Sequence, residues 1–401
     1  MKQTANPLYL QALLEELRLY GDHYTFSQRI EHFLSAATVD ELYEKVLERY
    51  EEDYERDRPG LVQDAMSLLW AARRGLSEAE LLELLGTGGE PLPRAHWSPL
   101  YLAAEQSLVS RSGLVGFFHD YLRQAVSDRY LPSEGAQQVA HLRLADYFET
   151  RDLGVRKVDE LPWQLAQAQA WPRLHTLLAD LPFFTAAWNT DEYEVKAYWA
   201  QLEGNSSLRM VDAYRAAVDA PERQQATTVF HVSKLLADTG HPSEALILRQ
   251  HLTERFRESG DRANLQTSLA GQGVILQARG DLDGAMSLHK EKERICRELG
   301  SKAGLQASLG NQALILRARG DLDGAMALLK EEERLCRELG NKEGLAISLA
   351  NQASVLASGM GRPREALPLA EEAYRLATQH GFAAVARQIQ PFLEALRSQA
   401  R

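Results

Sequence analysis

The sequence predicts a mainly α-helical protein, with a helical N-terminal half followed by a right-handed superhelix of repeated helix pairs. The seven residues Gly280–Met286 return as Gly320–Met326 after a step of 40 residues. The similarity continues, since Glu293–Gly300 matches Glu333–Gly340. A period of this length is typical of stacked helix pairs that share one continuous core. We therefore expect the C-terminal half to bind other molecules and not to carry out chemistry.

The composition indicates a large folded chain with a negative charge. Of its 401 residues, 45% are hydrophobic and 25% are charged, so it can bury a sizeable core and divide into several units. The formal net charge of −11 argues against a broad nucleic-acid surface, which needs clustered Lys and Arg. No apolar run approaches about 18 residues and no signal-peptide pattern opens the chain, so we expect a cytoplasmic protein with no membrane partner.

The N-terminal half opens with signals for helices. Asn6 suits the cap of a helix and Pro7 its first position. Further helical patterns cover residues 39–53 and 61–72. These patterns predict a helical segment that leads into a second, more mixed domain.

The mixed domain combines a capped helix with a hairpin. Ser77 caps a Leu-rich helix and Glu80 completes a capping box. Two strand-like segments then flank Ser112-Gly113, a two-residue hairpin turn, and a helix follows over 120–130. Helices followed by a hairpin predict a winged helix. We therefore expect a helical segment, a winged-helix-like domain, a helical linker and the repeat array, over residues 1–55, 56–132, 133–220 and 221–401.

The linker contains helical patterns over 139–150 and 161–180, together with an unusual number of aromatic residues. These are Trp163, Trp171, Phe183, Phe184, Trp188, Tyr193, Tyr198 and Trp199. We interpret them as the core that joins the winged helix to the repeats. An aromatic groove for a partner protein is the alternative.

Two motifs of this half resemble the region after the nucleotide-binding core of signal-transduction NTPases, the NACHT and NB-ARC type of regulator. They are Asn6–Leu10 and Gly116–Asp120, on either side of the Leu-rich winged helix. The resemblance covers residues 5 to 130 and extends into the linker. It implies that Pro7 lies against a nucleotide base and that His119 senses phosphate.

The sequence departs from that family at its catalytic centre, because it contains no Gly-x-x-x-x-Gly-Lys-Ser/Thr loop. Without the backbone cradle, the lysine and the Mg²⁺-binding hydroxyl, we expect no nucleotide hydrolysis by this chain alone and no cofactor. Pro7 and His119 are then structural relics. A separate chain that supplies the nucleotide-binding core is the alternative, and an apolar face left uncovered on the N-terminal helices predicts self-association.

The repeats number four and are marked by a glycine before each second helix. These glycines are Gly240, Gly280, Gly320 and Gly361, and the last step contains one extra residue, which we expect in a turn. Each glycine suits the left-handed position that ends a helix, and Asp281 or Asp321 can cap the next helix. Residues 382–401 predict a terminal helix that caps the stack.

This pattern resembles the tetratricopeptide repeat, in the form of about 40 residues found in kinesin light chains. The residues that carry the resemblance are the small residue of the first helix (Gly273, Ala313, Ala353), the Leu three positions later (Leu276, Leu316, Leu356) and the Ala of the second helix (Ala245, Ala285, Ala325, Ala366). The later small residue of the second helix is kept as Ala373 but replaced by Lys292 and Glu332, which predicts looser packing in the middle repeats.

The resemblance implies a peptide or protein ligand on the concave surface lined by the first helices. Asn at one first-helix position contacts the ligand backbone in this family, which implies this role for Asn311 and Asn351. His231 occupies the same position in the first repeat, and Gln277 and Arg317 follow the motif Leu. The alternative is that these side chains only solvate a helix face or bridge neighbouring repeats.

The predicted function is that of a non-enzymatic scaffold or regulatory module. A winged-helix DNA-binding transcriptional regulator with a repeat sensor is the alternative, although Glu78, Glu80 and Glu83 on its Leu-rich helix would repel phosphate. His119, His141 and His175 lack catalytic or metal-ligand spacing, so we expect no catalytic residue and no metal site. The only cysteines, Cys296 and Cys336, occupy equivalent repeat positions, and we interpret them as small core residues.

Overall fold

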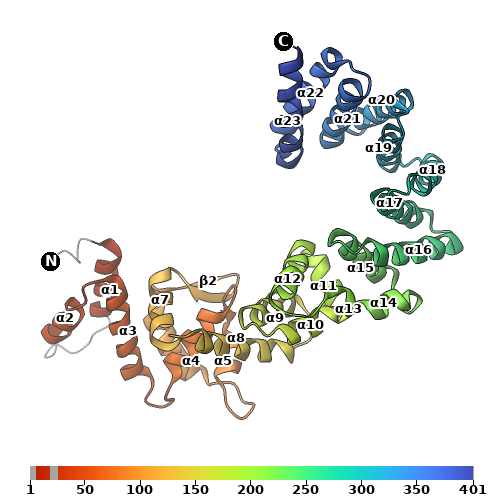
Figure 1. Cartoon of the computed structure of the whole chain (residues 1–401). Helices are drawn as coiled ribbons and strands as arrows, with labels where there is room; N and C mark the ends of the chain where they lie inside the picture. The colour runs from red at the N-terminus through yellow and green to blue at the C-terminus, as the bar shows by residue number, and fades with distance from the viewer. Residues whose placement is uncertain (1–5, 19–25, 401) are drawn as a thin grey trace. The chain divides into compact units, whose positions relative to one another are not determined.

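The computed structural model describes residues 6–18 and 26–400, which form helices and one small antiparallel sheet (Figure 1). The predicted mainly α fold class is confirmed. The chain divides into two compact units, Met1–Ala213 and Tyr214–Arg401. In the described part of the chain, none of the helices is both long and apolar enough to cross a membrane.

The first unit begins with three helices, α1 (Pro7–Arg18), α2 (Phe26–Leu34) and α3 (Val39–Tyr54). The buried Tyr9 hydroxyl of α1 donates to the backbone oxygens of Phe33 and Ala36, at 2.9 and 3.0 Å, and so satisfies the end of α2. Arg49 of α3 forms an ion pair with Glu16 of α1, and both side chains are 5% exposed. Helix α1 is therefore held by buried polar contacts as well as by the buried side chain of Leu13.

The segment predicted as a winged helix contains α4 (Leu61–Ala71), β1 (Leu76–Ser77), α5 (Glu78–Leu85), α6 (Arg94–Ala104), β2 (Leu108–Arg111), β3 (Leu114–Phe117) and α7 (Asp120–Tyr130). The strands pair antiparallel in the order β1-β3-β2. Ser112 and Gly113 of the hairpin turn have φ of 53° and 81°, values that a two-residue turn requires. The capping box of Ser77 and Glu80 is present, as predicted.

Two helices of the first unit that precede the linker, α2 and α6, were missed by the sequence analysis. Helix α6 contains Pro99 and follows the segment Pro91-Leu92-Pro93, which is typical of a loop. Its Trp97 and Leu100 are nevertheless fully buried, so tertiary packing outweighs the local proline signal. Helix α2 has only nine residues, too few to establish a clear period.

The linker forms α8 (Glu134–Glu149), α9 (Val155–Gln167), α10 (Trp171–Ala179), α11 (Leu181–Thr190), α12 (Glu192–Asn205) and α13 (Met210–Ala213). The helical pattern predicted over 161–180 belongs to two helices, because Gln169 has a φ of 54° and separates α9 from α10. Pro172 and Pro182 begin helices, whereas Pro162 lies inside α9. Of the eight aromatic residues, Phe183, Phe184, Trp188, Tyr198 and Trp199 are buried, which supports the core interpretation for these five.

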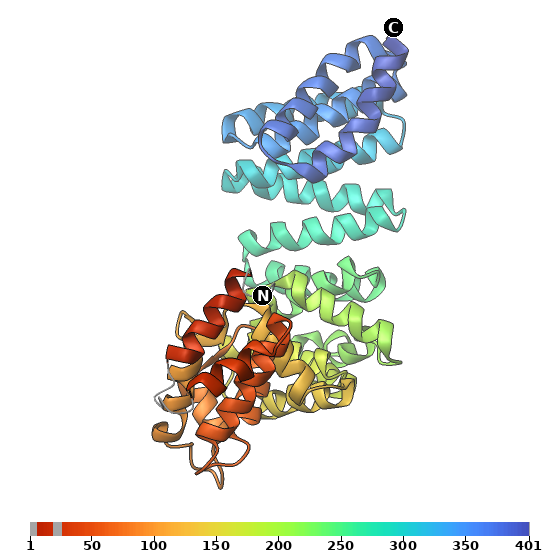
Figure 2. The same cartoon turned by 90° about the vertical axis from the view of Figure 1, so that its left-hand side faces the viewer.

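The second unit begins with α14 (Arg215–Asp219) and the 3₁₀ turn η2 (Pro221–Arg223). Four helix pairs follow: α15 (Ala226–Asp238) with α16 (Pro242–Ser259), α17 (Arg262–Ala278) with α18 (Leu282–Leu299), α19 (Lys302–Ala318) with α20 (Leu322–Leu339), and α21 (Lys342–Ser354) with α22 (Pro363–Gln379). Helix α23 (Ala383–Ala400) packs on α22. Within this unit the later pairs lie one above another in chain order, as Figure 2 shows.

The turns between paired helices have the predicted geometry. Gly240, Gly280, Gly320 and Gly361 all have a positive φ, between 65° and 92°. Asp281 and Asp321 each accept a hydrogen bond from a backbone N–H three residues later, at 2.9 Å. These local interactions define where each helix ends and the next begins.

The extra residue of the last step lies in a helix and not in a turn, so that expectation is wrong. Residues Val355–Gly359, at the end of α21, form a π-helical turn (η3). A π turn uses i to i+5 hydrogen bonds and so absorbs one residue without losing the helix axis. This arrangement keeps Val355 and Leu356 buried despite the longer repeat.

Buried polar side chains join each second helix to the first helix of the next repeat. The hydroxyl groups of Ser268, Ser308 and Ser348 donate to the backbone oxygens of residues 249, 289 and 329, at 3.1, 2.7 and 3.1 Å. Four residues further on, Gln312 and Gln352 donate to Glu293 and Glu333, each at 2.7 Å. Burying these polar groups without partners would cost stability. The hydrogen bonds of the serines and glutamines therefore favour one register of each first helix against the second helix before it.

The middle repeats do not pack loosely around their charged residues. Lys292 and Glu332 are only 5% and 4% exposed. Gly310 on α19 provides the space, because a Cβ atom there would lie 2.6 Å from Oε1 of Glu332. The same oxygen accepts a hydrogen bond of 2.9 Å from Gln306. The structure therefore corrects the prediction of looser packing.

Candidate functional site

The predicted peptide-binding asparagines lie at equivalent places on α19 and α21. Asn311 and Asn351 are half-buried, and within the described chain neither side-chain amide forms a hydrogen bond. An amide has one acceptor oxygen and two N–H donors, which match the backbone of an extended peptide. Both amides are therefore available to a ligand.

A pocket of about 210 Å³ surrounds Asn351 and is formed by three helices. We call it the repeat groove. Its lining residues are Arg317 of α19, Ile347, Ala350, Asn351 and Ser354 of α21, and Val385, Gln388, Ile389 and Phe392 of α23. The guanidinium of Arg317 donates to the Ser354 hydroxyl at 3.1 Å. Two predicted residues, Asn351 and Arg317, thus share one concavity with an apolar floor.

The other predicted residues do not line this groove. Asn311 lies one repeat before Asn351, and the half-buried His231 and Gln277 belong to α15 and α17. The sequence analysis missed Ile347 and Phe392. Ile347 is 41% exposed, so an apolar residue at a solvent-facing helix position was the available signal. Phe392 belongs to α23, which was predicted as a cap and also forms one wall of the groove.

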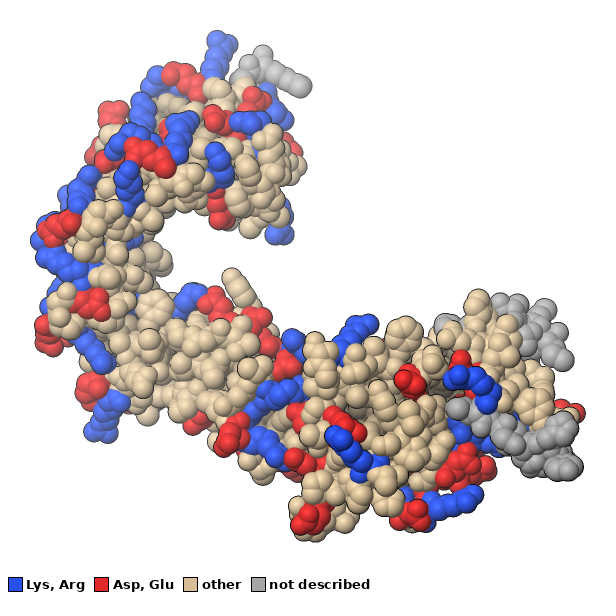
Figure 3. All heavy atoms as spheres, turned by 180° about the vertical axis from the view of Figure 1, so that it is seen from behind, with Lys and Arg blue, Asp and Glu red and all other residues tan. Residues whose placement is uncertain are grey.

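The charged side chains of the second helices are mostly paired with each other. Arg294 contacts Glu298 at 3.1 Å, and the equivalent Arg334 contacts Glu338 at 2.8 Å. On the face drawn in Figure 3, basic and acidic side chains are interspersed over the repeats. A mixed surface of this kind favours solubility over the binding of a polyanion.

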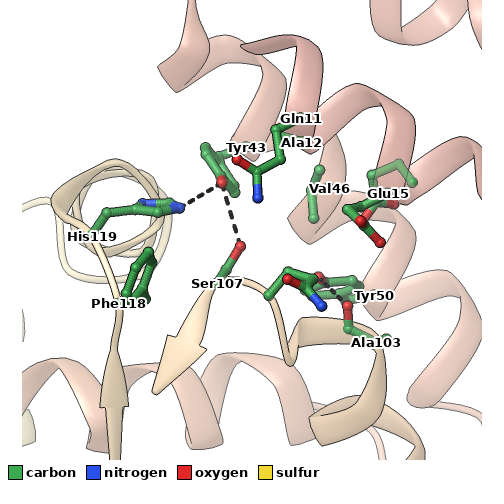
Figure 4. A pocket seen from close by; sticks show the side chains of 12 residues that line it. Gln11, Ala12, Glu15, Tyr43, Val46, Tyr50, Ala103, Ser107, Phe118 and His119 are labelled. Atoms are coloured by element: carbon green, nitrogen blue, oxygen red, sulfur yellow. Dashed lines mark hydrogen bonds between the residues drawn. The ribbon is translucent and has the colours of Figure 1, made fainter. Parts of the chain in front are cut away.

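His119 lies in a small pocket of the first unit, between α1, α3 and the hairpin (Figure 4). Its Nε2 is 2.8 Å from the Tyr43 hydroxyl oxygen, which is also 3.3 Å from the Ser107 hydroxyl oxygen. Burial lowers the pKa of His119 and raises that of Tyr43. The pocket measures about 40 Å³, which is enough for a water molecule and too small for a nucleotide.

The structure does not bring Pro7 and His119 into one cavity. Gln11, Ala12 and Glu15 of α1 line the His119 pocket, whereas Pro7 is exposed and is not among the lining residues. His141 is buried and lies 2.8 Å from the side-chain oxygen of Gln164. In the part of the chain that the structure describes, no cluster of three His, Cys, Asp or Glu side chains could hold a metal ion.

The two cysteines are buried and unpaired, in equivalent positions on α18 and α20. The Cys296 thiol donates to Oε1 of Gln266 at 2.9 Å. Burial raises the pKa of both thiols, to about 12 for Cys336, so neither has the character of a reactive thiolate. Their prediction as core residues is confirmed.

Residues 305–398 match the sequence profile of the tetratricopeptide repeat family. The matched segment, from α19 to α23, is therefore similar to tetratricopeptide repeats, whose members typically serve as protein-interaction scaffolds. A TPR repeat-containing protein of Dictyostelium discoideum is 34% identical over 204 residues, which are 50% of this chain and 12% of that protein. Putative tetratricopeptide repeat protein 41 of Homo sapiens is 26% identical over 314 residues, 69% of this chain and 22% of that protein. The chain thus spans a small part of these relatives.

Among solved structures, the chain is similar to a Signal Transduction ATPase with Numerous Domains (STAND) protein with a tetratricopeptide repeat sensor, from Pyrococcus horikoshii. The identity is 13% and the TM-score 0.39, over 98% of this chain and 65% of that one. Yeast Tom70 is 15% identical with a TM-score of 0.37, over 98% of this chain and 79% of that one.

Proposed function

We propose that this protein is a non-enzymatic interaction module that binds an extended peptide segment of a partner protein in the repeat groove. The observation that carries the proposal is the pair of equivalent, half-buried amides, Asn311 and Asn351, whose side chains form no hydrogen bond within the described chain. The second amide opens into the apolar pocket between α21 and α23. This combination matches a ligand with a regular backbone and one anchoring side chain.

In the proposed complex, the two amides pair with N–H and C=O groups of the peptide backbone. An apolar peptide side chain enters the pocket against Ile347 and Phe392, whose burial supplies the affinity. The pocket volume of about 210 Å³ suits one side chain and lies below the usual size of a small-molecule site. Arg317 at the rim binds a polar group of the ligand.

We propose that the first unit corresponds to the region that follows the nucleotide-binding core in STAND-type switch proteins. The element order from α4 to β3 and the sheet order β1-β3-β2 support this proposal, because they agree with the order expected for a winged helix. His119 has Tyr43 as its partner in this chain, so a separate nucleotide-binding chain would have to displace that contact before His119 could reach a phosphate. The module then acts in the cytoplasm as the sensing part of a larger assembly.

No specific observation favours the DNA-binding alternative. The helix that precedes the hairpin is α6, and not the Leu-rich helix α5 considered in the sequence analysis. The one arginine of α6, Arg94, forms an ion pair of 2.8 Å with Glu78 of α5. A recognition helix needs several unpaired basic or amide side chains.

The test is an affinity pull-down from lysate of the host, with wild type and the double variant Asn311→Ala, Asn351→Ala as baits. The matched control is Arg294→Ala, Arg334→Ala, which changes equivalent exposed positions in two successive repeats. Loss of a protein partner with the asparagine variant alone supports the repeat groove. Retention of all partners by that variant overturns it and directs the search to the first unit.

A further inference from the structure

We infer that the first unit contains a binding site for a small aromatic phosphate, in a pocket between the β2–β3 hairpin, α7 and α9. The pocket measures about 320 Å³, at the lower end of the range for small-molecule sites. We call it the arginine pocket, and the lining residues that carry the inference are Arg73, Arg74, Arg111, Arg123, Gly116 and Trp163. The site is separate from the repeat groove and does not depend on the function proposed for that groove.

The charge of the arginine pocket is opposite to that of the chain. Its lining contains four arginines and one acidic residue, Asp120, whereas the whole chain has a formal net charge of −11. Asp159 of α9 forms ion pairs with Arg73 at 3.1 Å and with Arg74 at 3.3 Å. Glu194 also contacts Arg73, at 2.5 Å. These two arginines are therefore held in place, and their charges are balanced.

The other two arginines have no carboxylate partner. Arg111 ends β2 and is exposed, and neither it nor Arg123 of α7 forms an ion pair with a side chain that the structure describes. The Arg123 guanidinium lies 5.5 Å from the Trp70 ring centre and donates to the Trp70 backbone oxygen at 3.4 Å. Asp120 is likewise without an ion pair among the described residues, and it balances only one of these two charges. The pocket thus keeps an excess of positive charge that attracts an anion.

One face of the hairpin forms a wall of the pocket. Successive side chains of a strand point to opposite faces, and Val115 of β3 lies on the buried face. The residues of the other face all line the pocket, and they are Val109, Arg111, Leu114 and Gly116. The pairing of β2 with β3 therefore places Arg111 and the bare backbone of Gly116 on the same wall.

Gly116 leaves open space that the fold itself does not require. Its φ is not positive, and a Cβ atom there would meet only the Cα atom of Gly75, at an ordinary contact distance of 3.8 Å. Gly75, in contrast, has a φ of 93°, and a Cβ atom on it would overlap the backbone oxygen of Val115. A glycine inside a strand weakens the strand and often marks a place where a ligand approaches closely. Gly116 fits this second role, because neither its backbone conformation nor its neighbours demand a glycine.

A flat ring that carries a phosphate fits this arrangement. Trp163, one of the linker aromatics, is only half-buried, so a ring can lie against its indole and over the bare strand at Gly116. A single guanidinium can bind both oxygens of a carboxylate, whereas a phosphate has three acceptor oxygens and needs more donors. Arg111 and Arg123 supply these donors from two different elements.

The experiment is isothermal titration calorimetry of the full chain with four probes at equal ionic strength: phenyl phosphate, benzoate, inorganic phosphate and phenol. We expect phenyl phosphate to bind at least tenfold more tightly than any of the other three, because it alone combines the ring with a phosphate. Arg111→Gln and Arg123→Gln should each weaken this binding at least tenfold, as expected for loss of a charge-assisted contact. The matched control is Arg294→Gln, at an exposed position of the second unit, which should leave the binding unchanged.

Gly116→Val tests the location of the site without removing a charge. Valine favours strands and meets no backbone clash here, so this variant should keep the Tm of wild type while it fills the pocket and loses phenyl phosphate. Unchanged binding by both arginine variants, or by a folded Gly116→Val, overturns the site. Equal binding of inorganic phosphate overturns the role of the ring, and equal binding of benzoate overturns the choice of phosphate. If wild type binds none of the probes, the inference is wrong, and peptide binding by the repeat groove is unaffected.

Discussion

His289 packs against Gly273, and the next repeat has other residues at these two positions. The contribution of this pair to the free energy of unfolding can therefore be compared between two successive repeats. His289 is fully buried on α18, and neither ring nitrogen has a hydrogen-bond partner in the described chain. A Cβ atom on Gly273 of α17 would lie 2.7 Å from the imidazole. In the next repeat the same two positions are Ala313 and Leu329, a small residue against an apolar one.

Burial, and next the nearby charge of Lys292, lower the pKa of His289 from 6.5 to about 4. The unfolded chain therefore binds the proton at a higher pH than the folded chain. Stability is unaffected above about pH 6.5 and falls as the pH is lowered towards 4. At about 1.4 kcal/mol for each pKa unit, the loss from this residue amounts to about 3 kcal/mol.

We expect His289→Leu to remove this pH-dependent loss and to add about 1 to 3 kcal/mol at pH 7, because two unpaired nitrogens leave the core. Gly273→Ala alone should cost about 1 to 3 kcal/mol through overlap with the ring. The double variant reproduces the third repeat, so the cost of Gly273→Ala should disappear when His289 is Leu. The assay is native-state hydrogen exchange of α17 and α18 amides between pH 7 and 4, which isolates the opening of this repeat.

The matched control transfers the pair to the next repeat. Ala313→Gly with Leu329→His should introduce the same acid-dependent loss into α19 and α20. If His289→Leu keeps the acid-dependent loss of α17 and α18, another group is responsible and the reasoning is refuted.

Three further predictions concern other charged and apolar residues. Lys292→Leu copies the buried Leu252 of the first repeat and should raise the free energy of unfolding by about 1 to 4 kcal/mol. The reason is that burial lowers the pKa of Lys292, so its charge is unfavourable at pH 7. A lower urea midpoint would contradict this. Arg49→Met should cost about 3 to 5 kcal/mol in urea unfolding, because it leaves Glu16 buried and unpaired. Arg294→Met, at an exposed pair, is the control and should cost under about 1 kcal/mol. Leu10 and Leu14 of α1 are 39% and 56% exposed on one face, so light scattering should detect self-association that Leu10→Gln with Leu14→Gln abolishes; a monomeric wild type at high concentration would end that hypothesis.

Predictions that depend on neighbouring residues agreed with the structure. The capping box of Ser77, the hairpin turn at Ser112 and the turn glycines of the repeats all act over two to four residues. The 40-residue period predicted the helix pairs for the same reason, since each pair repeats the same local signals. Helix α6 was missed because its local proline signal and its tertiary burial oppose each other.

The sequence by itself determined the fold class, the repeat boundaries and the identity of the half-buried amides. Only the tertiary structure decided which side chains meet. Asn351 shares its pocket with Phe392 of α23, and the Arg249 guanidinium lies against Gly271, contacts between residues 22 to 41 positions apart. Such contacts depend on how helices stack and on the space that a missing Cβ atom leaves, and neither is encoded in a short stretch of residues.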